Sequence, residues 1–225
     1  MSTRASSDAT SVRASILVVD DHPIIRRGLA KLIAEEADLD ICEGADNVED
    51  AFEQVKYLHP TLVLIDIALR DSNGLDLIAQ IRAYDPTIKT LVWSTFDEKI
   101  YAERVLHAGA MGYVNKQEPL ETVITAIHRV LNDEVYLSPR MANRVLQRLG
   151  NGRALDQDPI TALSDREIEV FRMIGQGMTT QLFARKLTVK PKTIEAYREK
   201  IKAKLALKYA AELNCRAVQW VLQNG

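Results

Sequence analysis

The chain has 225 residues, 47% hydrophobic and 27% charged, a composition typical of a globular protein long enough for one large domain or two ordinary ones. It shows neither a signal-peptide pattern nor an apolar run that could span a membrane, so we expect a cytoplasmic protein with no membrane partner. The net charge of −2 hides an asymmetry: residues 159–225 hold twelve basic and six acidic side chains (+6), and residues 1–158 hold seventeen and twenty-five (−8). Such a basic end is typical of a segment that meets a polyanion.

The first half of the chain alternates short apolar runs with amphipathic segments. Residues 1–14 are small and polar and predict a disordered tail, and residues 15–133 carry the alternation. We expect strands at 15–20, 39–45, 61–66, 89–94 and 112–115, and helices at 24–36, 47–58, 74–84, 98–108 and 119–132. Because these strands are continuously apolar and separated by helices, they predict an α/β fold with a parallel sheet covered on both faces.

This alternation ends after residue 133. Residues 134–158 predict a linker with one short helix at 138–149, where Pro139 would occupy the first helical position. The stretch 150–159 is rich in Gly, Asp and Asn, as linkers are. Residues 159–225 predict helices only, and therefore a second, all-α domain.

Polar residues follow the predicted strands at the point where each strand ends. The set is Asp20, Asp21, Asp66, Ser94 and Lys116. Because parallel strands end at one edge of their sheet, these side chains should meet there. Three carboxylates repel one another unless a cation lies among them, and oxygen ligands of this kind suit Mg²⁺. The histidines and the two distant cysteines form no pattern that would predict zinc.

Asp66 stands out because it interrupts the apolar stretch "TLVLIDIAL". A buried carboxylate needs a cation or a proton, and Mg²⁺ and Lys116 would compensate its charge. A carboxylate beside a metal and an ammonium is also a nucleophile suited to a phosphoryl group, whose oxygens the two cations would neutralise. Ser94 is placed to donate a hydrogen bond to the transferred group. The set therefore predicts that Asp66 accepts phosphate.

Three segments, "ILVVDDHPIIRRGL", "LVLIDIALRDSNGLDLI" and "GAMGYVNK", closely resemble the receiver domain of bacterial two-component response regulators. The resemblance covers residues 15–133 and implies a flavodoxin-like (βα)5 fold. It implies that a sensor histidine kinase phosphorylates Asp66. It also implies that Mg²⁺ is bound directly by Asp21 and Asp66, through water by Asp20, and by the backbone carbonyl of Ala68.

The same resemblance implies a conformational switch. Tyr113, three residues before Lys116, matches the aromatic residue that turns inward after phosphorylation, and it would act together with Ser94. Arg70 and Gln117 depart from the family pattern, because proline is common at both positions. Neither departure removes a chemical group, so they bear on the expected loop conformations and not on the site.

The basic end of the chain predicts a helix-turn-helix. Ser164 and Glu167 form a capping box that opens one helix, and Gly177 closes it. Thr179 or Thr180 opens a second helix, and a short turn leads to a third.

The third helix, which Pro191 opens, has two distinct faces. At 100° per residue, Ile194 and Ile201 lie on an apolar stripe, and the opposite face carries small alanines that allow close approach to a surface. Lysines and an arginine flank that face, so the helix could enter the DNA major groove with its flanks on phosphates. The predicted DNA contacts are Thr180, Lys190, Lys192, Thr193, Glu195, Ala196, Arg198, Glu199, Lys200 and Lys202.

"LSDREIEV", "GQGMTTQLFARKL" and "KPKTIEAYREKIKAKLAL" resemble the LuxR-type, or NarL/FixJ-type, DNA-binding domain. The resemblance implies four helices, a helix-turn-helix motif at 179–198 and a last helix at 210–222 that often makes the dimer contact. Thr188 replaces the usual turn glycine, Lys190 the usual N-cap serine, and Leu182 with Phe183 the usual acidic-aliphatic pair. A missing cap costs about 1 kcal/mol, which affects the affinity and not the fold.

These features together predict a transcriptional response regulator, not an enzyme, that binds double-stranded DNA as a homodimer once phosphorylated. A magnesium-dependent phosphatase of the haloacid dehalogenase type is an alternative. Such an enzyme needs a second aspartate two residues after the nucleophile, where this chain has Ala68. A third possibility, a phosphorylation-independent DNA binder that keeps the receiver for dimerisation, stays open on the sequence alone.

Overall fold

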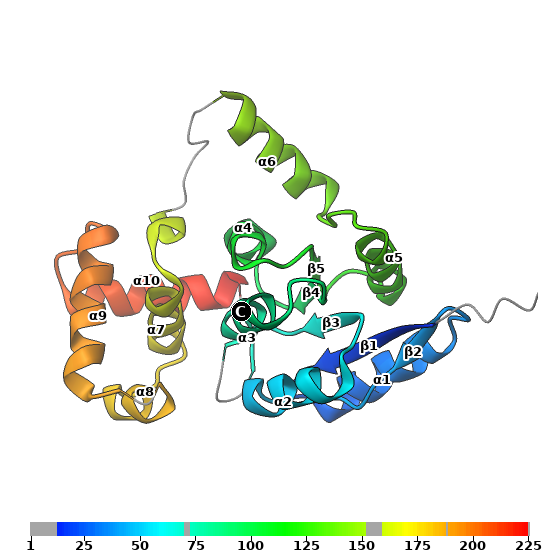
Figure 1. The fold of residues 1–225 in the computed structure, drawn as a ribbon. Coiled ribbons are helices and arrows are strands. Elements are labelled where there is room, and N and C mark those ends of the chain that lie inside the picture. The colour runs from blue at the N-terminus through cyan, green and yellow to red at the C-terminus, as the bar shows by residue number, and fades with distance from the viewer. Residues whose placement is uncertain (1–12, 70–72, 152–158, 188, 225) are drawn as a thin grey trace, which may run out of the picture.

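The computed structural model describes residues 13–69, 73–151, 159–187 and 189–224 (Figure 1). Its first part is a five-stranded parallel sheet in the order β2-β1-β3-β4-β5. The strands are β1 (Ala14–Val19), β2 (Leu39–Ile41), β3 (Leu62–Ile65), β4 (Lys89–Ser94) and β5 (Tyr113–Asn115). The predicted parallel sheet and the flavodoxin-like strand order are confirmed.

Five helices cover the sheet on both faces. They are α1 (Pro23–Ala34), α2 (Val48–Leu58), α3 (Gly74–Tyr84), α4 (Glu98–Ala108) and α5 (Leu120–Leu131). Alternate residues of each strand enter opposite cores, since Leu17 and Val19 pack with α2, α3 and α4, while Ile16 and Val18 pack with α1 and α5. Burial on both faces explains why the strands are continuously apolar.

The second strand is shorter than expected. It ends at Ile41, and Ala45 at the expected limit makes only an isolated bridge to Val19. The first strand begins at Ala14, one residue inside the segment expected to be a tail. Residues 1–12, Arg70 and Thr188 lie outside the described part of the chain, so the expectations for them stay predictions.

Helix α6 (Pro139–Asn151) ends two residues later than expected. Its C-terminal end stands away from the sheet and the helices that cover it (Figure 1). Its first half packs against the rest of the molecule, with Val145 partly buried against the core. Met141 is buried, and Ser138, just before the helix, bonds through its amide and hydroxyl to the Glu98 carboxylate of α4 at 3.0 and 2.6 Å. The helix therefore joins the receiver where α4 begins.

The C-terminal part is helical throughout its described residues. It comprises η1 (Pro159–Ala162), α7 (Asp165–Gly175), α8 (Thr180–Lys186), α9 (Pro191–Lys204) and α10 (Ala210–Asn224). Phe171, Phe183, Ile194 and Ile201 are fully buried and form the centre of its core. The predicted four-helix architecture is confirmed.

The ends of these helices follow the local sequence. The capping box of Ser164 and Glu167 is present, and Gly177 has a φ of +72°, the left-handed conformation that glycine adopts without strain. Thr179 caps α8, which decides between the two threonines expected there. Lys190 stands at the N-cap of α9 and makes no side-chain cap bond, as the sequence predicts.

Candidate functional site

The strand ends bring four of the five predicted side chains into direct contact. Lys116 Nζ lies 2.5 Å from Asp20 Oδ2 and 2.6 Å from Asp66 Oδ2. Ser94 Oγ donates to Asp66 Oδ1 at 2.8 Å, and the Ala68 amide donates to the same oxygen at 3.0 Å. Asp66 is thus held by an ammonium on one oxygen and by two neutral donors on the other.

Burial makes these contacts strong. Asp66 is 4% exposed and Asp20 is 1% exposed, so water screens their charges little. Burial alone would lower the pKa of Lys116, but the charges of Asp66 and Asp20 and their hydrogen bonds outweigh it and raise the pKa above its usual value. Lys116 therefore stays a cation beside the two carboxylates.

Asp21 lies next to this group with an unsatisfied oxygen. Its Oδ1 is buried and accepts no hydrogen bond, although His22 Nδ1 is 2.7 Å away. Asp20, Asp21 and His22 form a group of ligand atoms within 4.8 Å of one another. A buried carboxylate oxygen without a donor suits a divalent cation with oxygen ligands, so the residues present fit Mg²⁺.

His22 is the member of this group that the sequence reasoning missed. Considered alone, the histidines show no ligand spacing, yet His22 directly follows the acidic pair in "DDHP". It stands at the N-cap of α1, which turns its ring back toward Asp20 at 3.1 Å. Adjacency to a strand-terminal acidic pair was the available signal.

Tyr113 is buried and points inward, with 1% of its surface exposed. Its hydroxyl donates to the Phe96 carbonyl at 2.7 Å, and Asn115 Nδ2 donates to the same carbonyl at 2.9 Å. Burial, and next the nearby charge of Asp66, raise the pKa of Tyr113 well above its usual value, so its hydroxyl remains a donor. The short segment from Ser94 to Phe96 is thus bound at both ends, by Asp66 at Ser94 and by Tyr113 at Phe96.

That loop also contacts the C-terminal domain. The Arg172 guanidinium of α7 lies 4.4 Å from the centre of the Phe96 ring, a cation–π contact. Phe96 stacks in turn on Tyr101 of α4, with ring centres 4.8 Å apart. A narrow cavity between α7 and the receiver is lined by Ala68, Phe96 and Arg172 among others, so the contact lies beside the phosphoacceptor edge of the sheet.

Arg104 of α4 links the two domains through its guanidinium group. Its guanidinium donates to the carbonyls of Thr161 and Leu163 at 3.1 and 2.5 Å and to Asp165 Oδ1 at 2.5 Å. These acceptors surround the start of α7, whose N-terminal turn carries Asp165. The sequence could not have predicted this contact, because Arg104 has the position and character of an ordinary surface residue of α4.

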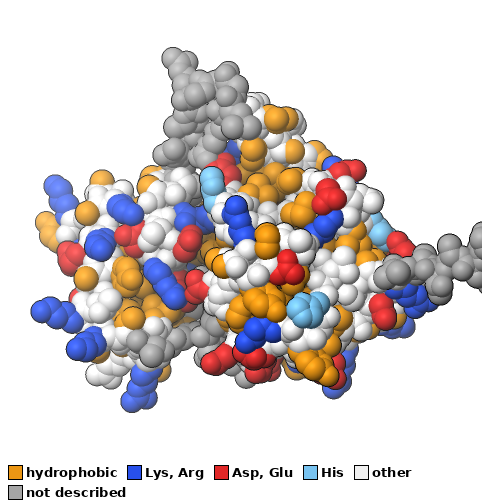
Figure 2. Space-filling model, viewed as in Figure 1, with side chains coloured by type: hydrophobic (Ala, Val, Ile, Leu, Met, Phe, Trp, Pro, Cys, Tyr) orange, Lys and Arg blue, Asp and Glu red, His pale blue; other side chains and the backbone are white. Residues whose placement is uncertain are grey.

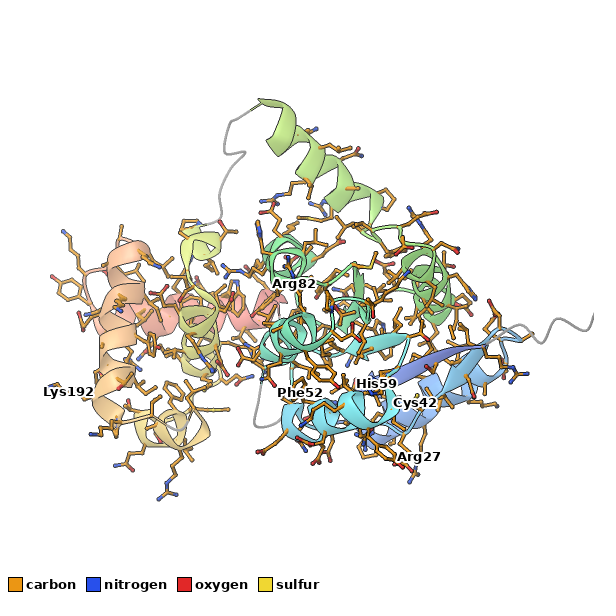
Figure 3. All side chains as sticks on the ribbon, viewed as in Figure 1. Arg27, Cys42, Phe52, His59, Arg82 and Lys192 are labelled. Carbon is orange, nitrogen blue, oxygen red and sulfur yellow. The ribbon has the colours of Figure 1, made fainter. Side chains whose placement is uncertain are left out.

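The predicted DNA contacts centre on one outward face of α9, joined by its N-cap Lys190 and by Thr180 of α8. Lys192, which projects from the edge of the molecule in Figure 3, is exposed, as are Glu195, Ala196 and Glu199. Figure 2 shows basic side chains standing out around this edge. The other predicted contacts lie at its margins: Lys190 and Lys200 are exposed, and Thr180, Thr193, Arg198 and Lys202 are half-buried.

Several members of this face are linked to one another. Thr180 Oγ1 donates to Glu195 Oε1 at 3.0 Å, which ties α8 to α9. Lys202 Nζ lies 2.9 Å from Glu199 Oε1, and Arg198 Nη2 donates to Asn214 of α10 at 3.1 Å. None of the helices in the described part of the chain is long and apolar enough to cross a membrane.

Fold and site together define a class: a signalling protein in which a receiver-like acidic site is joined to a helix-turn-helix domain. Comparison with known families agrees. Residues 16–128 match the response regulator receiver domain, and residues 161–217 match the luxR family of bacterial regulatory proteins. The chain belongs to the two-component response regulators with a LuxR-type DNA-binding domain, and it is a transcriptional regulator rather than an enzyme.

Relatives with both domains cover nearly the whole chain. The response regulator GacA of Pseudomonas aeruginosa is 32% identical over 204 residues, which are 91% of this chain and 95% of GacA. The oxygen regulatory protein NreC of Staphylococcus carnosus is 30% identical, over 88% of this chain and 94% of NreC. RcsB of Salmonella enterica serovar Typhimurium, solved on the rprA promoter with phosphomimetic BeF3−, shares the fold with a TM-score of 0.68 at 20% identity over 90% and 96% of the two chains.

Proposed function

We propose that Asp66 accepts a phosphoryl group from a sensor histidine kinase and that its loading controls the binding of promoter DNA by α9. The observation that supports this most is the environment of Asp66, whose two oxygens are held by Lys116, Ser94 and the Ala68 amide. In the transfer, a carboxylate oxygen attacks phosphorus, and the P–N bond of the phosphohistidine breaks with its electrons returning to the imidazole. Lys116 neutralises charge on the transferred oxygens.

Asp20, Asp21, Asp66 and the carbonyl of Ala68 would hold Mg²⁺ in this site. When bound, the ion supplies positive charge against the phosphoryl oxygens. The buried, undonated Oδ1 of Asp21 supports this assignment. The protein would act in the bacterial cytoplasm, where its DNA lies.

Ser94 and Tyr113 would carry the signal from Asp66. In the structure Ser94 donates to the Asp66 carboxylate, and a phosphoryl group on Asp66 would offer it new acceptor oxygens. A movement of Ser94 displaces the loop to Phe96, whose carbonyl is held by Tyr113 and whose ring meets Arg172 of the other domain. Loading would therefore weaken the contact between the domains.

We divide the chain into a receiver at residues 15–133, a linker at 134–158 and a DNA-binding domain at 159–225. Release of the DNA-binding domain from the receiver matters because we propose that the protein binds DNA as a dimer. Two recognition helices must reach half-sites about one helical turn apart. A domain fixed to its receiver by Arg104 and Arg172 has little freedom to adopt that spacing. Linking two half-sites multiplies the phosphate contacts and raises the effective affinity. The solved structure of two RcsB dimers on two parallel DNAs supports this proposal.

The transfer itself is tested by incubating the purified chain with acetyl phosphate and Mg²⁺ and measuring intact mass. We expect one added phosphoryl group on the wild-type protein, none on Asp66→Asn, and none on the wild-type protein in excess EDTA. Equal labelling of the wild-type and Asp66→Asn proteins would contradict the assignment of Asp66.

A further inference from the structure

The face of α9 that would enter DNA carries two acids at its centre. Glu195 and Glu199 are four residues apart and therefore lie one above the other on the helix. Their side chains are 57% and 70% exposed. Ala196, which follows Glu195, is also exposed, and its small side chain allows close approach of this face. An acidic centre is unexpected on a surface that meets a polyanion.

The surroundings of the two acids fix them without removing them from the surface. Glu195 accepts a hydrogen bond from Thr180 at 3.0 Å and lies 3.8 Å from the Arg198 guanidinium, while Glu199 lies 2.9 Å from Lys202 Nζ. These partners stand on α8 and at one margin of the face. Arg198 and Lys202 offset the two negative charges locally, while Lys190 and Lys200, both exposed, stay available to phosphates.

A carboxylate at this position needs a hydrogen-bond donor in the groove. Phosphates repel it, and an ionised carboxylate can only accept hydrogen bonds. In the major groove the donors are the amino groups of cytosine and adenine, whereas guanine and thymine present acceptors. In adenine the acceptor N7 lies beside the amino group, so N7 would face the second carboxylate oxygen. Two acceptors would then meet without a donor between them. Cytosine has no such acceptor beside its amino group, so it is the base that suits these side chains.

We propose that Glu195 and Glu199 are specificity-determining residues that each accept a hydrogen bond from the N4 amino group of a cytosine in the operator. The inference rests on the proposed DNA binding by α9 and adds the base that the helix selects. Lys192, on the same exposed face, would donate to the acceptor edge of a guanine. At a guanine or thymine edge each acid would be desolvated without a donor, so the acids also reject wrong sequences.

The spacing of the cytosines follows from the helix. Four residues advance the helix by about 6 Å, which is about two base-pair steps of 3.4 Å. The two acids therefore read positions about two base pairs apart in each half-site. Each glutamate reads its own position, so replacing one of them by glutamine should affect that position only. The preferred base there should become adenine, because glutamine bonds adenine through both N6 and N7.

The test is a selection of randomised duplexes by the full-length protein loaded with beryllofluoride, followed by affinity measurements on the selected duplex. We expect cytosine at two positions, and a loss of about 5-fold to 100-fold in affinity when either is replaced by thymine. Glu199→Gln should prefer adenine at one of the positions and Glu195→Gln at the other. Glu53→Gln, an exposed acid of α2, is the matched control for loss of charge and should select the wild-type sequence.

The outcomes separate this inference from the proposed function. If the wild-type protein enriches a sequence but both glutamine variants enrich the same one, the assignment of base readout to these acids is overturned. If the wild-type protein enriches no duplex at all, the proposed DNA binding itself is overturned. A gain in affinity of the glutamine variants for every duplex, without a change in the preferred base, would also contradict the inference, because it would show a charge effect alone.

Discussion

Asp66 shows how a single buried carboxylate is made tolerable. Lys116 compensates its charge, while Ser94 and the Ala68 amide orient the oxygen that does not face the ammonium. The same donors would meet a transferred phosphoryl group, so little reorganisation is needed when the group arrives. The backbone around Asp66 must be positioned equally well, and Gly74 is the residue that allows this.

Gly74→Ala tests that close approach. A Cβ at this position would lie 2.3 Å from the Asp66 carbonyl oxygen and 2.9 Å from the Ile67 Cα, both of them backbone atoms. We expect a loss of about 1–3 kcal/mol in unfolding free energy, measured by urea denaturation, and slower labelling by acetyl phosphate. Gly28→Ala is the control, because its Cβ would meet nothing within 4 Å, and it should be neutral or stabilising. Equal stability of the two variants would contradict this account.

Glu167 gives the C-terminal domain an acid-sensitive link. Burial alone would raise the pKa of Glu167, but hydrogen bonds from Lys204 and Ser164 outweigh it and lower the pKa below its usual value. The stabilisation should therefore be complete above the unfolded-state pKa of about 4.3 and be lost as pH falls through the lower folded-state value. We expect Glu167→Gln to be less stable than wild type at pH 7, with the difference shrinking in acid.

The measurement is denaturant unfolding followed by Trp220 fluorescence in a Trp93→Phe background, at a series of pH values. Trp220 packs against Phe171 in the same domain, with ring centres 5.7 Å apart. A stability difference between wild type and Glu167→Gln that stays constant down to pH 3 would contradict the proposed role of the ionised carboxylate.

At the scale of helices and strands, periodicity and caps predicted almost every element. α3 and α4 have the expected bounds, and most other ends lie within one or two residues of the prediction. The agreement is close because Gly, Asn and Ser at the helix ends mark where helices begin and end. β2 was overestimated because its pairing with β1 breaks after Ile41. Ala45 still makes an isolated bridge to Val19, but Glu43 and Gly44 lie outside the strand. α6 was underestimated because its polar end has the composition of a linker.

The start of α9 offers a test at this scale. Lys190 occupies the N-cap without capping, so Lys190→Ser should add a cap bond and stabilise the domain by about 1 kcal/mol, as seen in thermal unfolding. Because Lys190 is also a predicted phosphate contact, the same change should weaken DNA binding and reduce its salt dependence. Thr179→Ala, which removes the cap of α8, should destabilise instead. A variant with serine that binds DNA as well as wild type would remove Lys190 from the contact set.

At the scale of the whole molecule, the contact between the domains is what the sequence did not reveal. The site residues lie at strand ends, where position alone predicts their meeting, whereas Arg104, Arg172 and Phe96 come from three separate segments. Each one has an ordinary local role, and only the docking of α7 on the receiver brings them together. Long-range contacts between surface residues leave no periodic pattern in a single sequence.

Arg172→Ala tests whether this contact restrains the protein. We expect a higher DNA affinity of the unphosphorylated variant and a smaller further gain on loading, because part of the release would already have occurred. Arg27→Ala on α1, away from the contact (Figure 3), is the control and should behave as wild type. An Arg172→Ala protein whose affinity responds to loading as fully as wild type would show that the contact does not transmit the signal.

The central claim is that phosphoryl loading of Asp66 sets the affinity of the distant helix α9 for DNA. Its most direct test is a titration of the operator duplex by fluorescence anisotropy, with and without beryllofluoride and Mg²⁺, for the wild-type and Asp66→Asn proteins. We predict tighter binding on loading for the wild-type protein and no change for Asp66→Asn. An operator affinity of the wild-type protein that is the same with and without beryllofluoride would contradict the account.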